Sequence, residues 1–377
     1  RMRAPMMSIH TVAAGGGSIL VFDGTRFRVG PESAGANPGP ACYRRGGPLA
    51  VTDANVMVGK IRPEFFPAVF GASGDQPLDA AVVGEKFAAL ARQIEKATGE
   101  KRTREEIADG FLTIAVENMA NAIKQISVQR GFDVTRYTLC CFGGAGGQHA
   151  CRVADALGMT TIFIHPLAGV LSAYGMGLAD LRVLREKAVE AALDEAIAPE
   201  LVRSLDELAA EGETEMRRQG IAAERIQVQR KLHLKYEGTD STLVVAWAEP
   251  DGARAAFAEA YRQRYGFTMP DKAVIVEAVA VEVVGATESA EARPVAVATP
   301  SAPPNPLASV AMFSDGRSHT TPAFAREALA PGMRIDGPAI IVEKNATTII
   351  EPGWRAEVTA LDHLVLRRVI ALQRIAA

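Results

Sequence analysis

Cysteine is scarce in this sequence, and its placement argues against two kinds of structure. The four cysteines are Cys42, Cys140, Cys141 and Cys151, and two of them are adjacent. Cysteines so few and so unevenly placed do not make the framework of a disulfide-rich domain, so we expect reduced thiols and a cytoplasmic protein. No CxxC pair occurs, which argues against a zinc site.

Strong charge and long apolar runs are also absent. The formal net charge of −3 gives no reason to expect nucleic acid or an anionic membrane as a partner. No apolar run approaches the roughly 18 residues that a membrane-spanning helix needs. The 48% of apolar and 23% of charged residues are ordinary for a soluble globular protein, and 377 residues suffice for two or three domains.

The usual phosphate-binding fingerprints are missing too, but a glycine-rich stretch from Tyr137 to Leu157 stands out. It contains neither GxGxxG nor GxxxxGK[ST]. It predicts an apolar strand, Thr138 to Phe142, then a glycine turn and a helix that opens near Gln148. We call this turn the second glycine turn, because another one precedes it in the chain. Its glycines are Gly143, Gly144, Gly146 and Gly147. Because glycine permits close approach to a ligand and helix starts attract anions, the stretch is either a nucleotide cradle or only a tight turn.

A first glycine turn, Gly15-Gly16-Gly17-Ser18, lies between two expected strands, Ile9 to Ala13 and Ile19 to Phe22. Its consecutive backbone N–H groups are suited to line an oxyanion or phosphate pocket, and the alternative is a plain strand connection. Asp23-Gly24 then predicts a hairpin into a third strand that begins at Phe27.

Asp53 is the candidate carboxylate for metal binding or catalysis. It follows the strand-like Leu49 to Val51, from where a carboxylate can bind Mg²⁺ through water or orient a nucleophile. The plainer alternative is a cap on a helix that begins near Asn55.

The rest of the chain reads as alternating helices and strands. We expect helices at Leu78 to Thr98, Thr103 to Arg130, Asp194 to Gln219 and Arg254 to Tyr265, and strands at Thr161 to Ile164 and Val274 to Val284. Residues 286–308 are rich in Ala, Pro and Ser and are read as a linker. Short strands after it suggest a small β domain, so the expected domains are 1–185, 186–285 and 309–377.

Several long motifs resemble the hydantoinase A/oxoprolinase family, and they cover nearly the whole chain in order. They are IHTVAAGGGSI from Ile9, VGPESAGANPGPACYRRGG from Val29, VTDAN from Val51, CFGGAGGQHAC from Cys141 and LSAYGMGLAD from Leu171. The resemblance implies an α/β fold, half of an actin/sugar-kinase-like ATPase, followed by an α+β region and a small β domain. It implies an enzyme that uses ATP to open a five-membered lactam such as 5-oxoproline.

The resemblance also implies roles for residues. The second glycine turn and Gln148 would bind the nucleotide; Gly15, Gly16, Gly17 and Ser18 would face the reaction centre, with Ser18 and Asp53 as catalytic candidates and Asp53 also the Mg²⁺ candidate. The expected cofactors are ATP, Mg²⁺ and a monovalent cation such as K⁺. The expected partners are a hydantoinase B-like domain or subunit and further copies of the chain.

The segment YEGTD, Tyr236 to Asp240, resembles the oxoprolinases more than the hydantoinase or carboxylase members. Thr239 and Asp240 are candidates to recognise a polar substrate group, and an ordinary turn is the alternative. The family's DxGGT phosphate loops are absent, and Arg1 opens the chain, so we expect a piece of a longer polypeptide that has no turnover by itself. A hydantoinase or ketone carboxylase subunit and a non-catalytic assembly fragment remain the alternatives.

Overall fold

The computed structural model describes residues 9–12, 14–286 and 305–372, and these divide into two units. Unit 1 holds residues 129–132 and 173–286, and unit 2 holds residues 9–128, 133–172 and 305–372. Helix α5, Leu171–Leu178, spans the boundary between them in the sequence. Each unit is described by itself.

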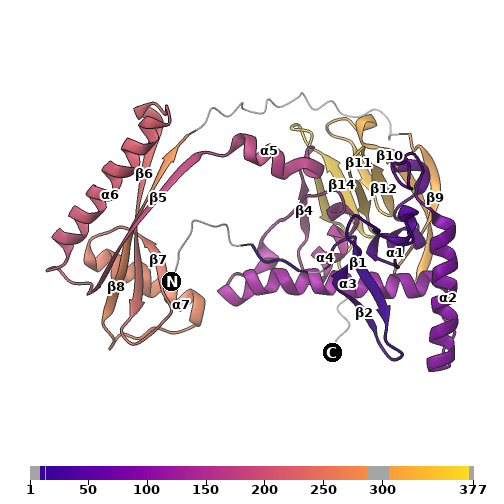
Figure 1. Cartoon of the computed structure of the whole chain (residues 1–377), viewed down its shortest axis with the longest axis horizontal. Coiled ribbons are helices and arrows are strands. Elements are labelled where there is room, and N and C mark those ends of the chain that lie inside the picture. Colours follow the sequence, from indigo (N-terminus) through magenta and orange to yellow (C-terminus); the bar gives the residue numbers. More distant parts are fainter. Residues whose placement is uncertain (1–8, 13, 287–304, 373–377) are drawn as a thin grey trace. The chain divides into compact units, whose positions relative to one another are not determined.

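Unit 1 is a four-stranded antiparallel sheet with two helices (Figure 1). The elements are β5 Leu181–Ala192, α6 Ala198–Arg218, β6 Ile226–Tyr236, β7 Leu243–Ala246, α7 Pro250–Tyr265 and β8 Val274–Gly285, with the strand order β5-β8-β6-β7. Apolar residues of both helices pack with alternate residues of the strands in one core, which contains Leu201, Phe257 and Val281. This unit encloses the expected region 186–285.

Unit 2 begins with a hairpin and three helices, as the sequence indicates. The elements are β1 Ser18–Phe22, β2 Phe27–Ser33, α1 Val51–Met57, α2 Ala80–Thr98 and α3 Arg104–Ile126. The Asp23 carboxylate accepts hydrogen bonds from the backbone N–H groups of Thr25 and Arg26, which closes the hairpin with Phe22 opposite Phe27. Thr103 and Glu106 form a capping box at the start of α3.

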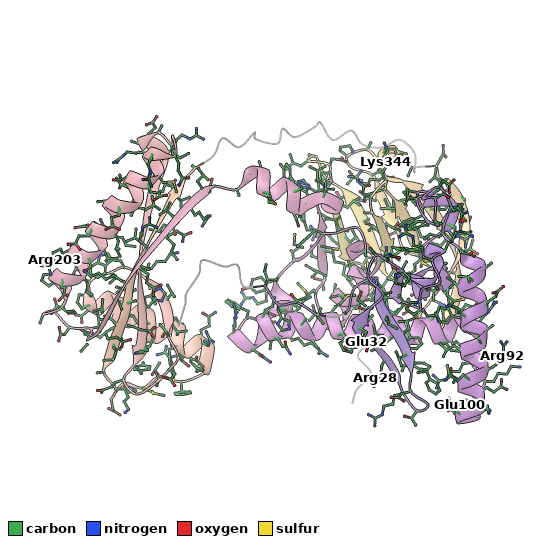
Figure 2. All side chains as sticks on the ribbon, viewed as in Figure 1. Arg28, Glu32, Arg92, Glu100, Arg203 and Lys344 are labelled. Atoms are coloured by element: carbon green, nitrogen blue, oxygen red, sulfur yellow. The ribbon has the colours of Figure 1, made fainter. Side chains whose placement is uncertain are left out.

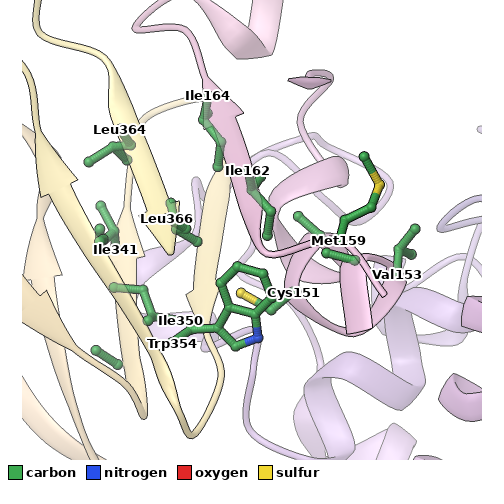
Figure 3. Close-up of a cluster of buried hydrophobic side chains, with 14 of the residues drawn as sticks. Cys151, Val153, Met159, Ile162, Ile164, Ile341, Ile350, Trp354, Leu364 and Leu366 are labelled. Atoms are coloured by element: carbon green, nitrogen blue, oxygen red, sulfur yellow. The ribbon is translucent and has the colours of Figure 1, made fainter. Parts of the chain in front are cut away.

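The remaining elements of unit 2 form two further sheets. They are β3 Leu139–Cys141, α4 Ala150–Leu157, β4 Thr161–Ile164, β9 Ala308–Ser314, β10 Arg317–Ala325, β11 Arg334–Asp336, β12 Ala339–Val342, β13 Thr347–Ile350, β14 Trp354–Val358 and β15 Leu364–Arg368. The strand orders are β11-β14-β15-β4-β3 and β13-β12-β10-β9. Figure 3 shows the core that joins them, with Trp354 and Cys151 beside strand residues such as Ile162 and Leu366.

The structure differs from the expected domain division at the C-terminal end. Strand β15 pairs with β4, so Leu366 lies opposite Ile162. The last strands therefore belong to the same sheet as β3, the strand that the second glycine turn follows. These strands therefore do not form a small β domain of their own, because their apolar faces are buried in the core of unit 2. The expected linker, 286–308, lies mostly outside the described residues.

Three local expectations are corrected. Residues 9–12 form no strand, and no described strand pairs with them; Ala13 lies outside the described residues. Leu49 to Val51 is not a strand, because α1 already begins at Val51 after a single bridge between Ile19 and Ala50. Helix α5 and strand β5 occupy a stretch in which the sequence analysis predicted no helix or strand.

Candidate nucleotide site

The first glycine turn is closed by its own serine. The N–H of Ser18 donates to the Gly15 carbonyl at 3.0 Å, and the Ser18 hydroxyl accepts from the Gly15 N–H at 3.0 Å. A Cβ atom at Gly16 would lie 2.8 Å from the Thr52 hydroxyl, and one at Gly17 would lie 2.9 Å from the Ser33 hydroxyl. Only glycine fits these two positions without displacing a neighbour, so the close approach explains the glycines.

Helix α1 anchors this turn. The N–H and the hydroxyl of Thr52 both donate to the Gly16 carbonyl, at 2.9 and 3.0 Å. The Gly17 carbonyl accepts from the Ala34 N–H at 2.8 Å. The turn is therefore fixed through its carbonyls. Among the described residues, the N–H groups of the half-buried Gly16 and Gly17 have no hydrogen-bond partner, so they are candidates to bind a ligand.

Asp53 holds backbone rather than an open ligand position. Its buried carboxylate accepts hydrogen bonds from the N–H groups of Ala41, Cys42 and Ala50, at 2.9, 2.8 and 2.8 Å. Burial raises the pKa of Asp53, and the hydrogen bonds oppose that rise. Both oxygens are engaged, so the geometry favours the capping alternative, and the carboxylate does not fit an Mg²⁺ ligand.

The second glycine turn lies at the carboxyl end of β3 and packs against the loop between β12 and β13. Gly143 has φ +88°, and its N–H donates to the Ala168 carbonyl at 2.8 Å. A Cβ at Gly144 would lie 2.7 Å from the carbonyl oxygen of Asn345, and one at Gly147 would lie 2.8 Å from that of Thr347. Lys344 projects from the same loop (Figure 2). Much of the turn's glycine content is thus explained by packing within unit 2.

Asn55 of helix α1 reaches the end of this second turn. Its Nδ2 donates to the Gln148 Oε1 at 3.0 Å and lies 3.3 Å from the His149 Nε2. All three side chains are buried. Gln148, predicted to bind nucleotide, therefore uses its side-chain oxygen inside the protein.

A buried ion pair that the sequence analysis missed lies in the same unit. The Lys60 ammonium group, 0% exposed, lies 2.5 Å from the Glu351 Oε1, and the Ser314 hydroxyl donates to Oε2 at 2.7 Å. Burial alone would raise the pKa of Glu351, but the charge and hydrogen bond of Lys60 and the hydrogen bond of Ser314 leave it below its ordinary value. The only sequence signals are a lysine and a glutamate inside otherwise apolar surroundings.

Asp240 belongs to unit 1, whereas both glycine turns belong to unit 2. It is an exposed residue just after Thr239, whose N–H and hydroxyl donate to the Tyr236 carbonyl at 3.0 and 2.8 Å. These bonds are those of an ordinary turn, and they leave the Asp240 carboxylate at the surface.

Two general features bound the chemistry of the described residues. Within residues 9–12, 14–286 and 305–372, no three His, Cys, Asp or Glu side chains gather in a group that would hold a metal ion. In the same part of the chain, no helix is long and apolar enough to cross a membrane.

Together these observations define an α/β protein in which one short helix, α1, forms hydrogen bonds to both glycine turns. These are the two turns that the sequence analysis proposed as ligand-binding sites. Comparison with family models then gives the identity. The hydantoinase/oxoprolinase model matches residues 1–185, and the model of the C-terminal domain of that family matches residues 188–369. The chain belongs to the hydantoinase/oxoprolinase family.

Individual relatives agree with this assignment. The chain is 39% identical to 5-oxoprolinase 1 of Arabidopsis thaliana over 376 residues, which cover 96% of this chain and 29% of that protein. The crystal structure of ATP-dependent caprolactamase from Pseudomonas jessenii matches with a TM-score of 0.81 and 27% identity, covering 94% of this chain and 52% of that one. Nucleotide-free acetone carboxylase shares the fold, with a TM-score of 0.69 and 21% identity over 94% of this chain and 52% of that one. The chain thus spans between 29% and 52% of the length of these relatives.

Proposed function

We propose that this chain is the ATP-binding and substrate-side portion of an ATP-dependent 5-oxoprolinase, an enzyme that opens a five-membered lactam to glutamate. The single observation that carries the proposal is the bracing of two glycine turns by α1, in a chain whose most similar relatives include 5-oxoprolinases. An actin/sugar-kinase-like arrangement of the ATP-binding half is part of this proposal.

The two turns have different roles in this proposal. Adenosine packs against the backbone of the second turn, Gly143 to Gly147. The first turn presents the N–H groups of Gly16 and Gly17 to the oxyanion that develops on the lactam carbonyl. ATP supplies a phosphoryl group that turns the carbonyl oxygen into a leaving group. Ser18 shapes the turn through its bond to Gly15, which supports a positioning role for its hydroxyl.

Mg²⁺ and a monovalent cation belong to the proposal as companions of ATP, but Asp53 does not hold them. Its three backbone hydrogen bonds assign it to keeping the start of α1 beside residues 41 and 42. Metal ligands would then come from the nucleotide's phosphates, water and residues other than Asp53.

A related ATP-dependent reaction is the alternative, since a caprolactamase and an acetone carboxylase share the fold. The YEGTD segment, Tyr236 to Asp240, which resembles the oxoprolinases in sequence, supports the oxoprolinase reading. We would incubate a preparation that contains this chain and the remaining segments of its longer relatives with ATP and 5-oxoproline, caprolactam, hydantoin or acetone with bicarbonate. Glutamate release from 5-oxoproline alone supports the proposal, whereas turnover of only another substrate contradicts it.

A further inference from the structure

Helix α1 presents two polar side chains to two different glycine turns. Thr52 and Asn55 are three residues apart, so they lie on one face of the helix, one turn from each other. Thr52 bonds to Gly16 of the first glycine turn, and Asn55 bonds to Gln148 and His149 at the end of the second. A displacement of either turn must therefore move α1 or break one of these bonds.

The contact with Asn55 favours one tautomer of His149. With the Asn55 amide turned so that its Nδ2 donates to Gln148, the His149 Nε2 that faces the same nitrogen is placed to accept, which is the role of an unprotonated ring nitrogen. The imidazole is then neutral, with its proton on Nδ1. Three charged groups face this ring: Lys60, Arg152 and Glu351. Burial, and then the charges of Lys60 and Arg152, lower the pKa of His149 to about 3, which agrees with a neutral ring.

Two atoms of this pair have no partner among the described residues. They are the Asn55 Oδ1, an acceptor, and the His149 Nδ1, a donor, and both are fully buried. Buried polar atoms without a partner cost free energy, so each one calls for an explanation, such as a bound water or a functional role. A purely structural contact between α1 and residues 148 and 149 would be made with apolar side chains at lower cost.

We propose that Asn55 is a positioning residue which, through Gln148 and a neutral Nδ1-protonated His149, sets the second glycine turn against the first. This inference rests on the proposed function, in which the second turn binds the nucleotide and the first turn faces the lactam carbonyl. The Asn55 amide holds the second turn in place but does not itself touch the nucleotide. Nucleotide bound at the second turn is thereby oriented toward the N–H groups of the first turn.

The first test is the tautomer of His149, which does not depend on activity. We would record the imidazole ¹⁵N and ¹H NMR signals of the whole chain labelled at histidine, with His149→Asn to assign the signal. We expect a protonated Nδ1 and an unprotonated Nε2. A proton on Nε2 would mean that Asn55 presents its oxygen to the ring, and it would overturn the inference.

The second test converts the amide into a carboxylate by Asn55→Asp. A carboxylate beside Nε2 favours the imidazolium, so the pKa of His149 should rise by about 1–3 units, and a new ionisation should enter the pH dependence of ATP binding. Asn121→Asp, at an exposed position of α3, is the matched control and should add none. An Asn55→Asp variant that folds and binds ATP with the pH dependence of the wild type would overturn the inference.

The third test separates positioning from stability. In the preparation that also contains the remaining segments of the longer relatives, Asn55→Ala should lower kcat about tenfold or more, which corresponds to one lost hydrogen bond of about 1.4 kcal/mol, with a smaller change in KM for ATP. Because Asn55→Ala also removes an internal contact, folding is checked by circular dichroism and by the melting temperature. Absence of ATP binding in the wild type would contradict the proposed function, whereas an unchanged kcat in folded Asn55→Ala would overturn this inference alone.

Discussion

At the scale of single residues, unit 2 contains a buried ion pair. Lys60 and Glu351 are buried and pair with each other, and the Ser314 hydroxyl donates a hydrogen bond to the second oxygen of the Glu351 carboxylate. Removing one partner leaves the other charge buried without compensation, which is costlier than never having had the pair. We therefore expect the pair to hold the structure around Asn55 and His149 in place.

We predict that Lys60→Met lowers the free energy of unfolding by about 3–5 kcal/mol, because it leaves the Glu351 charge unpaired. Arg355→Ala breaks an exposed pair with Asp336 and should cost far less, because solvent screens that pair. Urea titration followed by circular dichroism measures both. Equal losses in the two variants would show that burial of the Lys60–Glu351 pair does not matter.

Asp155 gives a pH dependence of stability. Burial raises its pKa to about 6, although the Trp354 Nε1–H and Arg368 oppose the rise. The folded state therefore holds the proton more tightly than the unfolded chain, so this group's contribution is fully present below about pH 4 and is lost as the pH rises through 6.

We predict that, between pH 4 and 7, Asp155→Asn removes a decline in stability on the order of 1–2 kcal/mol, a figure reduced for the solvent exposure of the carboxylate. Denaturation series at fixed ionic strength measure the difference between wild type and variant. A pH dependence identical in both would contradict the raised pKa of Asp155.

At the scale of elements, the glycine turns show how far packing and function overlap. A Cβ at Gly144 meets the Asn345 carbonyl at 2.7 Å, whereas a Cβ at Gly177 of α5 meets nothing within 4 Å. Loss of activity after substitution of Gly144 would therefore not separate nucleotide contact from misfolding. Gly15 offers a cleaner probe, because a Cβ there also meets nothing within 4 Å.

We predict that Gly144→Ala destabilises the protein by about 1–3 kcal/mol through overpacking against the β12–β13 loop. Gly177→Ala, inside a helix, should be neutral or stabilising by up to about 1 kcal/mol. Thermal unfolding of the two variants beside the wild type checks this, and an undisturbed Gly144→Ala would mean that the loop moves away freely.

The sequence predicts elements well where local chemistry determines them. The hairpin at Asp23-Gly24 was expected at the residues where it is found, and short strands were expected after residue 308, where β13 to β15 lie, because turn residues and alternation are local signals. Helix α5 was missed because Gly175 and Gly177 are poor helix formers. Strand β5 was missed because its many charged side chains obscure the alternation.

Long-range partners set the limit of prediction at the site. The glycines identified both turns, but their neighbours come from distant segments: Asn55 meets Gln148, Gly144 meets Asn345 and Lys60 meets Glu351. No local pattern specifies such pairs. The role of Asp53 could not be predicted for the same reason, because two of the three backbone N–H groups that donate to its carboxylate belong to the distant residues 41 and 42.

At the scale of the whole molecule, the chain carries two units and covers part of each relative's length. The expected DxGGT phosphate loops are not in the sequence. We predict that the chain by itself shows no hydrolysis of ATP stimulated by 5-oxoproline. A coupled phosphate-release assay on the purified chain tests this, and stimulated turnover would show that the missing loops are dispensable.

The central claim is that the first glycine turn faces the reaction centre of a lactam-opening enzyme. The most direct measurement is ATP-dependent release of glutamate from 5-oxoproline by a polypeptide that contains this chain and the segments of its longer relatives. Wild type is compared with Gly15→Ala and with the control Gly177→Ala. We predict release by the wild type and the control and a loss of at least about tenfold in folded Gly15→Ala, because the added methyl group would occupy the open space beside the turn that the reacting groups need. Full activity in folded Gly15→Ala, or no glutamate from the wild type, would contradict the account.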